Sequence, residues 1–277
     1  MKVSLLIANY NNGKYFQDCY NSIIAQTYGN WEAVIIDDKS TDDSVEVIKI
    51  IIGSDERFRL IELPENKGVG YVKNLLATEA RGVFCAYLDP DDAIAENALE
   101  RCLQAFTNEN IIAAYSKITF CDSDLKPMYD FKQIRQIYND PYFFNLPTQI
   151  NALFVFRKSA FDKTSGIDTS LSSAVDQDLY LKLLEHGDAK FIPENLYLYR
   201  RHEKGISQSS SKNKAKENFG KVIFAAMKRR NLKSINGVPV PDEYPGSEKI
   251  FEMLEYQNKI PYRIKKKLKI FWEKITG

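Results

Sequence analysis

Short apolar runs alternate with helical patterns through the N-terminal part of this chain. The runs predict strands at 3–7, 33–36, 58–63 and 84–88, and the apolar spacing between them predicts helices at 15–25, 44–52 and 70–80. This alternation favours a largely parallel sheet covered by helices on both sides. Right-handed connections would place the C-terminal ends of these strands along one edge of the sheet.

The alternation loosens after residue 107. We expect a helix from 97 to 107, short strands at 111–115, 117–120, 152–157, 190–192 and 196–200, and a helix near 177–186. An aromatic-rich stretch, 129–146, lies among them and would help to form an acceptor site. Ser207–Ser211 (SQSSS) has the composition of a mobile loop.

The sharpest change of polarity follows the fourth predicted strand. There Cys85–Leu88 runs directly into Asp89, Asp91 and Asp92. Crowded carboxylates at the end of a buried strand repel one another unless a divalent cation or a ligand offsets the repulsion. The simpler alternative is a turn and helix cap, which the same residue types also favour.

The first two strands end in a similar way. The second runs into Asp37 and Asp38, and a carboxylate there can accept a hydrogen bond from an N–H of a nucleobase. Capping of the next helix by Ser40 or Asp42 is the alternative for this segment, but it does not explain Asp38. The first strand releases Tyr10 into a polar loop, where its ring could stack on a base. Ligands in open α/β sheets bind beyond such strand ends, so these segments could face one crevice.

Together these residues resemble the inverting family 2 glycosyltransferases, nucleotide-sugar-dependent enzymes of the GT-A fold. The resemblance covers most of residues 1–205. In chain order it rests on Ala8-Asn9-Tyr10-Asn11, Gln26-Thr27-Tyr28, Trp31-Glu32, Asp37-Asp38-Lys39-Ser40-Thr41-Asp42, Asn66-Lys67-Gly68, Lys73-Asn74, Asp89-Pro90-Asp91-Asp92, Gly166-Ile167-Asp168, Asp176-Gln177-Asp178-Leu179 and Arg200-Arg201-His202. It implies a Rossmann-like, mostly parallel central sheet flanked by helices.

The resemblance also implies roles for individual residues on the donor side. Asp91 would bind a divalent cation, Mn²⁺ or Mg²⁺, with Asp89 nearer the ribose or a metal-bound water and Asp92 supporting both. In the rest of the donor site Asp38 would recognise the base, Tyr10 would stack on it, the backbone of Ala8 would contact it, and Asn66, Gly68 and Lys73 would line the ribose and diphosphate. Lys73 departs from the arginine common at this position, so it keeps the charge but loses the bidentate fork.

For the catalytic base the resemblance indicates Asp176, which would take the proton of the acceptor hydroxyl. Val175 stands where the family usually has a glutamate. The alternative for Asp176 is a helix N-cap without chemistry. His202 corresponds to a family histidine near the diphosphate and is a candidate metal ligand, although a lone histidine can also be an incidental loop residue.

Length and charge divide the chain unequally. Its 277 residues, 44% hydrophobic, suit one substantial core with an appendage. We expect a GT-A domain at 1–205, with a nucleotide-sugar half (1–107) and an acceptor half (108–205), and a basic helical extension at 206–277. The overall charge of +1 conceals 17 Lys/Arg against 8 Asp/Glu in residues 203–277, which leaves −8 for the rest.

The chain's cysteines and hydropathy indicate a cytoplasmic protein. Cys19, Cys85, Cys102 and Cys121 form no CxxC pair, which favours reduced thiols over disulfides or a zinc site. We find no signal-peptide pattern and no apolar run long enough to span a bilayer. The expected location is the cytoplasm, with the inner face of the cell membrane as the alternative that the tail described next would allow.

The C-terminal tail predicts an amphipathic helix. Ile264, Leu268, Phe271, Trp272 and Ile275 share one stripe, and the lysines 265, 266, 267, 269 and 274 occupy the rest. Such a helix can lie on an anionic membrane. Alternatively, the stripe packs onto the domain and the lysines face water.

The expected partners are a nucleotide-sugar donor, a saccharide or lipid-linked acceptor and an anionic membrane, with no nucleic acid because the main body is acidic. A sugar-nucleotide pyrophosphorylase is disfavoured because no glycine-rich loop follows the first strand, where Asn9–Asn12 stands. A catalytically inactive nucleotide-sugar binding protein stays open, since Val175 and Lys73 are departures that a decayed site would accept.

Overall fold

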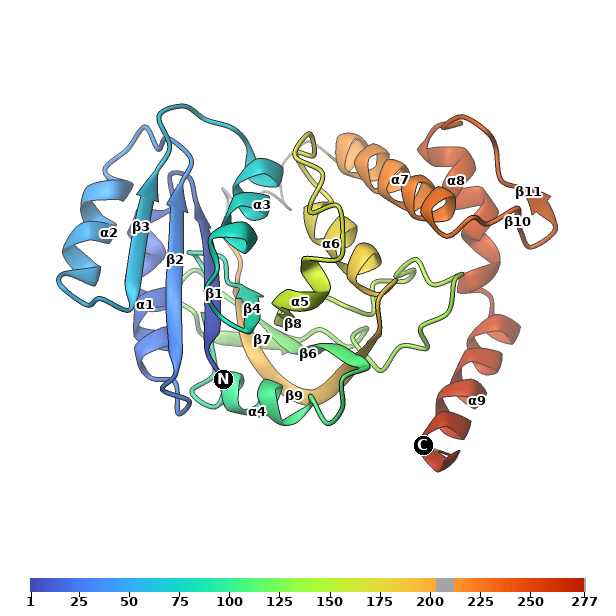
Figure 1. Ribbon diagram of the computed structural model, residues 1–277, viewed down its shortest axis with the longest axis horizontal. Helices are drawn as coiled ribbons and strands as arrows, with labels where there is room; N and C mark the ends of the chain where they lie inside the picture. Colours follow the sequence, from blue (N-terminus) through green and yellow to red (C-terminus); the bar gives the residue numbers. More distant parts are fainter. Residues whose placement is uncertain (203–211, 277) are drawn as a thin grey trace.

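The structure is a computed structural model that describes residues 1–202 and 212–276, with side chains up to Trp272. The predicted loop at Ser207–Ser211 lies outside the described residues, as do the side chains of Lys274 and Ile275. One large sheet with the strand order β3-β2-β1-β4-β8-β6-β9-β5 forms the centre of the molecule (Figure 1).

The N-terminal half of this sheet is parallel, as predicted. It contains β1 (Val3–Asn9), β2 (Trp31–Asp37), β3 (Phe58–Glu62) and β4 (Phe84–Tyr87), connected by α1 (Phe16–Ile24), α2 (Ser44–Ile52) and α3 (Val69–Glu79). β2 is buried along its whole length because helices cover both faces. Right-handed connections put α1 and α2 on one face and α3 on the other, since the chain reverses direction across the sheet after β3 (Figure 1).

The second half of the sheet is mixed. β8 (Phe154–Arg157) runs antiparallel between β4 and β6 (Ile111–Cys121), β9 (Asp188–Arg200) lies parallel to β6, and β5 (Ala93–Ile94) and β7 (Pro127–Asp130) pair antiparallel with β9 and β6. The α/β prediction with helices flanking a central sheet is therefore confirmed, while the parallel arrangement is limited to β1–β4 and the β6–β9 pair.

Two predictions of paired short strands are wrong, because β6 and β9 are each continuous. The register shifts between Ser116 and Lys117, where Ser116 pairs with Ile192 and Lys117 with Asn195. Pro193 and Glu194 bulge out there, since proline has no N–H for the ladder. Pairing resumes beyond the bulge, so the proline interrupts the ladder without ending the strand.

Some of the remaining elements share the core of the sheet. The full set is η1 (Gly13–Tyr15), α4 (Ala98–Gln104), α5 (Lys158–Phe161), α6 (Val175–Leu183), α7 (Lys212–Arg229), β10 (Ser234–Ile235), β11 (Val238–Pro239), α8 (Ser247–Leu254), η3 (Glu255–Asn258) and α9 (Ile260–Thr276). Buried side chains of α7 and α8, such as Ile223, Met227 and Leu254, belong to the same apolar cluster as the sheet. Arg229 and Arg230 pair with Glu185, which follows α6, and so connect the end of α7 to the sheet-containing part of the molecule.

Two compositional expectations can be compared with the structure. Cys19, Cys85, Cys102 and Cys121 are all buried and unpaired, so the prediction of core thiols is confirmed. None of the helices in residues 1–202 and 212–276 combines the length and apolar character needed to cross a bilayer.

Candidate active site

The candidate site lies along the edge where the parallel strands end. In the register of the sheet Asn9 is opposite Asp37, and Leu6 is opposite Tyr87, two residues before Asp89. Ala8 is the second-last residue of β1, and Tyr10 follows the strand with 45% of its surface exposed. The segments that the sequence singled out are therefore neighbours at one edge.

The carboxylate of Asp38 is fixed by backbone donors. The N–H groups of Lys67 and Gly68 donate to its two oxygens at 2.6 and 2.8 Å. Asn66 Nδ2 donates to the Asp38 carbonyl at 2.8 Å. Gly68 has a φ of +84°, which suits glycine, and directly precedes α3. The structure thus brings Asp38, Asn66 and Gly68 together.

Asp37, one residue earlier, is satisfied by its own loop. Asn9 Nδ2 donates to it at 2.7 Å, and the Ser40 N–H donates at 2.8 Å. Ser40 therefore binds Asp37, whereas Asp42 accepts from the N–H of Ser44 at the start of α2. The N-cap of α2 is Asp43, which makes no side-chain cap hydrogen bond, so neither Ser40 nor Asp42 caps this helix. Asp38 takes its donors from Lys67 and Gly68.

At the end of β4 the chain forms the turn that the sequence allowed. The Asp92 N–H donates to the Asp89 carbonyl at 3.1 Å. Asp92 is buried and accepts from Tyr197 Oη at 2.7 Å and from the Arg200 N–H at 2.8 Å. Burial, followed by the charges of Asp91 and Asp89, raises the pKa of Asp92 well above its ordinary value. The helix cap is a different residue, Asn97, which precedes α4.

Asp91 faces His202 across the edge. Its Oδ2 lies 2.8 Å from His202 Nε2, and the histidine side chain is only 6% exposed. The imidazole ring lies 4.7 Å from the ring of Tyr15. Among the described residues, Nδ1 of His202 is buried and has no hydrogen-bond partner. His202 is therefore packed against Asp91 and Tyr15.

These residues fit a divalent cation that is bound together with a phosphate-bearing ligand. Within the described ranges, no three His, Cys, Asp or Glu side chains converge enough to hold a metal ion by themselves. Asp91 and His202 supply one oxygen and one nitrogen ligand. Magnesium-type sites typically take one or two protein ligands and complete their shell with water and substrate phosphates. The buried Nδ1 of His202, which has no partner among the described residues, is consistent with a further polar group at this pair.

Lys73 joins the end of β4 to α6. Its Nζ lies 2.8 Å from Asp176 Oδ1 and 3.7 Å from Asp89 Oδ1. Burial alone would lower the pKa of Lys73, but the charges of Asp176 and Asp89 outweigh it and raise that pKa. The pKa of Asp89 is also raised. Burial is the largest cause and outweighs the opposite effect of Lys73, although 45% of the Asp89 side-chain surface is exposed to solvent.

The N-cap interpretation of Asp176 is wrong. The N-cap of α6 is Ala174, with a φ of +58°, and no side chain caps the helix. Asp176 lies in the first turn, where the helix dipole favours a negative charge. Its side chain is 47% exposed and pairs with Lys73.

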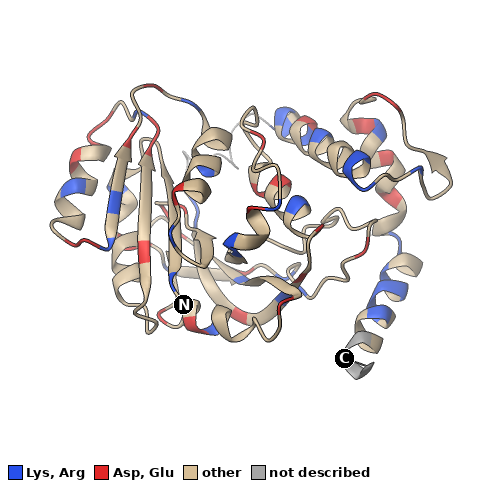
Figure 2. Cartoon of the chain, in the orientation of Figure 1, with Lys and Arg blue, Asp and Glu red and all other residues tan. Residues whose placement is uncertain are grey.

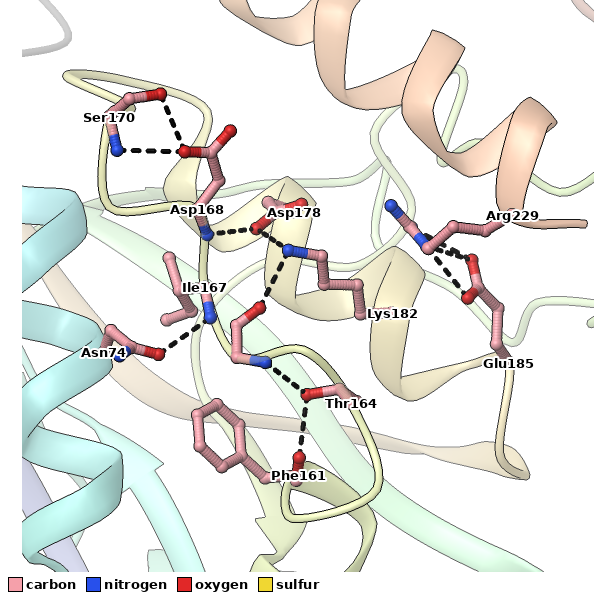
Figure 3. Close-up of polar contacts among 11 residues, drawn as sticks. Asn74, Phe161, Thr164, Ile167, Asp168, Ser170, Asp178, Lys182, Glu185 and Arg229 are labelled. Carbon is pink, nitrogen blue, oxygen red and sulfur yellow. Dashed lines mark hydrogen bonds and ion pairs between the residues drawn. The ribbon is translucent and has the colours of Figure 1, made fainter.

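A polar cluster that the sequence did not reveal positions α6 (Figure 3). Asn74 Oδ1 on α3 accepts from the Ile167 N–H at 2.9 Å, and Asp178 accepts from the Asp168 N–H at 2.8 Å. Lys182 Nζ donates to both Asp178 and the Gly166 carbonyl at 2.8 Å. A Cβ on Gly166 would lie 2.5 Å from Asn74 Oδ1, so only glycine allows this contact. The cluster fixes α6 against α3 and so sets the distance between Asp176 and Lys73.

The role of Arg200 was also missed. It donates through Nε to the Asp91 carbonyl and through Nη2 to Asp18, both at 2.7 Å, and its guanidinium lies 4.8 Å from the Tyr15 ring. Its place in the Arg200-Arg201-His202 segment was the available signal. Its partners come from distant parts of the chain and could not be inferred.

Comparison with known proteins gives one family. Residues 4–165 match the sequence pattern described as "Glycosyl transferase family 2". Chondroitin synthase from Escherichia coli is 31% identical over 245 residues, which cover 86% of this chain and 34% of that protein. The chain spans about a third or less of the length of the curated synthases it matches.

Solved structures give the same fold. S. aureus TarS 1–349 in complex with UDP-GlcNAc has a TM-score of 0.67 at 19% identity, over 93% of this chain and 72% of that chain. The mannosyltransferase PcManGT from Pyrobaculum calidifontis, solved with GDP-Man and Mn²⁺, has a TM-score of 0.60 at 14% identity, over 95% and 77% of the two chains. At these identities the likeness shows the fold alone.

Proposed function

Since the chain belongs to glycosyl transferase family 2, we propose that it transfers a sugar, with inversion, from a nucleoside diphosphate donor to a hydroxyl group of a saccharide or lipid-linked acceptor. A UDP-sugar is the proposed donor, and the product would belong to a cell-surface polysaccharide or glycolipid. The name of the E. coli relative and the UDP-GlcNAc complex of TarS support this choice. Buried unpaired cysteines support a cytoplasmic reaction.

The observation that carries the proposal is the Lys73 bridge. One buried ammonium contacts both Asp89, at the end of β4, and Asp176, on α6. The first carboxylate belongs to the proposed donor site, and the second is the proposed base. A transferase needs these two groups close together, because the acceptor oxygen must approach the anomeric carbon in line with the leaving diphosphate.

On the donor side, Asp38 would accept a hydrogen bond from a base N–H. Its orientation is already set by Lys67 and Gly68, so little ordering would be needed on binding. Tyr10 is exposed enough to stack on the base, and Ala8 would contact it through its backbone. Asn66 and Gly68 would line the ribose and diphosphate.

Asp91 and His202 would hold Mn²⁺ or Mg²⁺, which stabilises the negative charge that develops on the leaving diphosphate. Asp89 would lie near the ribose. Lys73 adds a fixed positive charge at the same edge. Because it is a point charge without the guanidinium fork, we expect it to contact phosphate through one oxygen at a time.

Asp176 would accept the proton of the acceptor hydroxyl. In the structure Lys73 binds this carboxylate, and the phosphates of a bound donor would compete for the same ammonium. We propose that donor binding draws Lys73 toward the diphosphate and thereby frees Asp176 as a base. The order of events would then be donor first and acceptor second.

The test is nucleotide release from a panel of UDP-, GDP- and dTDP-sugars, with Mn²⁺, Mg²⁺ or EDTA. We expect metal-dependent nucleotide release from one donor, and we expect Asp91→Asn and Asp176→Asn each to lower the rate of release about a hundredfold or more. Asp162→Asn is the matched control, since Asp162 is an exposed carboxylate whose one ion pair among the described residues is with Lys158. Metal-dependent thermal stabilisation by a donor without release under any acceptor condition would favour the inactive binding protein. No response to any donor would contradict both functions.

A further inference from the structure

The outward face of α9 is apolar, the reverse of the usual arrangement on a protein surface. Ile260, Ile264, Leu268 and Phe271 are 70%, 53%, 55% and 57% exposed. Their spacing of four, four and three residues puts them on one side of the helix. Trp272 beside them is 62% exposed. These five large apolar side chains therefore form one continuous exposed stripe.

The inward face of the same helix is basic and aromatic. Lys266 Nζ lies 3.1 Å from Asp140 Oδ2 and donates to the Tyr138 carbonyl at 3.2 Å. Lys269 Nζ lies 4.6 Å from the centre of the Tyr138 ring. Tyr262 packs edge-on against Tyr256, with ring centres 5.0 Å apart. These contacts hold α9 on the domain through its polar side, so the expectation that the stripe packs inward with lysines in water is wrong.

Positive charge flanks the exposed stripe on both sides. At 100° per residue, Lys265 falls beside Trp272, and Arg263 and Lys267 fall beside Ile260 and Phe271, and all three basic side chains are exposed. Residues 259–272 contain six Lys/Arg and no Asp/Glu. Figure 2 shows blue along this helix. A pocket of about 370 Å³ lies beside it and is lined by Lys265, Lys266 and Lys269 together with Asp140.

We propose that α9 lies flat on an anionic lipid surface, with its apolar stripe inserted at the headgroup boundary and its flanking basic residues among the headgroups. Apolar burial and attraction to anionic headgroups act together in such helices. A second copy of this chain is a poorer occupant, because two α9 helices face to face would bring their flanking charges together. Figure 1 shows α9 at the opposite end of the molecule from α2, where it is accessible to a flat surface.

The test is co-sedimentation of the full chain with vesicles of phosphatidylcholine alone or mixed with phosphatidylglycerol. We expect binding to the anionic vesicles and weaker binding to the neutral ones. Ile264→Glu with Phe271→Glu should weaken binding by about a hundredfold or more, which is what losing two buried apolar side chains implies. Lys265→Ala with Lys267→Ala should also weaken it roughly tenfold and reduce its salt sensitivity.

The control is Ile50→Glu, which changes an equally large, 80% exposed side chain on α2. It should bind vesicles like the parent chain, and all variants should keep the parent melting temperature because the altered side chains are exposed. Absent binding, or binding that survives the Ile264→Glu, Phe271→Glu change, would overturn the proposal. A dimer that this double change dissociates, without vesicle binding, would assign the stripe to a second copy. Vesicle binding needs no sugar transfer, so its failure and the failure of nucleotide release are separate results.

Discussion

Two strands of the parallel sheet end in paired carboxylates, yet the two ends differ in how their charges are compensated. After β2, Asp37 and Asp38 accept hydrogen bonds from Asn9, Ser40 and the backbone of Lys67 and Gly68. After β4, Asp89, Asp91 and Asp92 have fewer donors. Burial, followed by the charges of neighbouring carboxylates, raises the pKa values of Asp89 and Asp92.

This difference indicates that the carboxylates after β2 form a preformed recognition site, whereas those after β4 lack a full positive counter-charge. Carboxylates with a full set of donors are stable without a ligand and can orient one. Carboxylates that are pushed toward their protonated forms gain most from a cation. The first end would therefore contribute chiefly to stability and donor orientation, and the second chiefly to metal-dependent chemistry.

The largest effect on turnover should come from Asp176, which Lys73 connects to Asp89 at the end of β4. Asp176→Asn removes the proposed base while preserving its size, so turnover should fall about 10²–10⁴-fold. Donor affinity should not fall and should tend to rise, because the change removes the carboxylate that competes with the diphosphate for Lys73. Initial rates combined with donor binding by calorimetry would measure both. Turnover within a few-fold of the parent would eliminate Asp176 as the base.

The next effect concerns the cation. Asp91→Asn should lower turnover about a hundredfold and abolish the difference between Mn²⁺ and EDTA, because a carboxylate ligand is lost. In metal-free buffer the same change should not lower the melting temperature, since it relieves repulsion from Asp89 and Asp92. An unaltered metal response would show that the cation binds elsewhere or is not needed.

At the end of β2, replacing a carboxylate by an amide should change the stability of the fold. Asp37→Asn leaves at least one buried donor, from Asn9 or Ser40, without its acceptor, and we expect the free energy of unfolding to fall by about 1–3 kcal/mol. Urea denaturation of this variant beside Asp91→Asn measures the contrast directly. Equal destabilisation of both variants would contradict the distinction between the two ends.

The smallest effect uses a carboxylate at the other end of β2. Burial would raise the pKa of Glu32, but hydrogen bonds from Ser4 and the Arg81 N–H, together with Lys2, outweigh it and lower that pKa from 4.5. Its ionised form therefore stabilises the fold above pH 4.5, and this contribution is lost as the pH falls through the lowered value. Glu32→Gln should be less stable than the parent at neutral pH, and the difference should shrink in acid. Melting curves across this range would detect it, and a constant difference would contradict the ionic origin.

Much of the parallel half could be predicted because its strands are short apolar runs bounded by polar loops. The strands of the second half were harder to predict. Pro193 predicts the end of a strand, but β9 continues beyond it because it pairs with β6 on both sides of the proline. Local pattern cannot show such tertiary support.

The candidate site also contains residues that the sequence predicts and residues that it does not. Asp38, Asp91 and Asp176 could be proposed from the sequence because their motifs resemble a family. Arg200 and Tyr197 act through partners far away in the sequence, and nothing local indicates those contacts. Helical periodicity grouped Ile264, Leu268 and Phe271 on one face, but it could not tell whether that face points inward or outward.

The shared core of α7, α8 and the sheet has a consequence for cooperativity. Because Ile223, Met227 and Leu254 pack into the same cluster as the strands, and Arg230 donates to the carbonyls of Phe143 and Leu181, the segment 212–254 and the sheet should unfold in a single transition. A chain shortened before α7 would expose part of that cluster to water. A chain shortened at Lys259 would lose only a helix that touches the rest through its polar side.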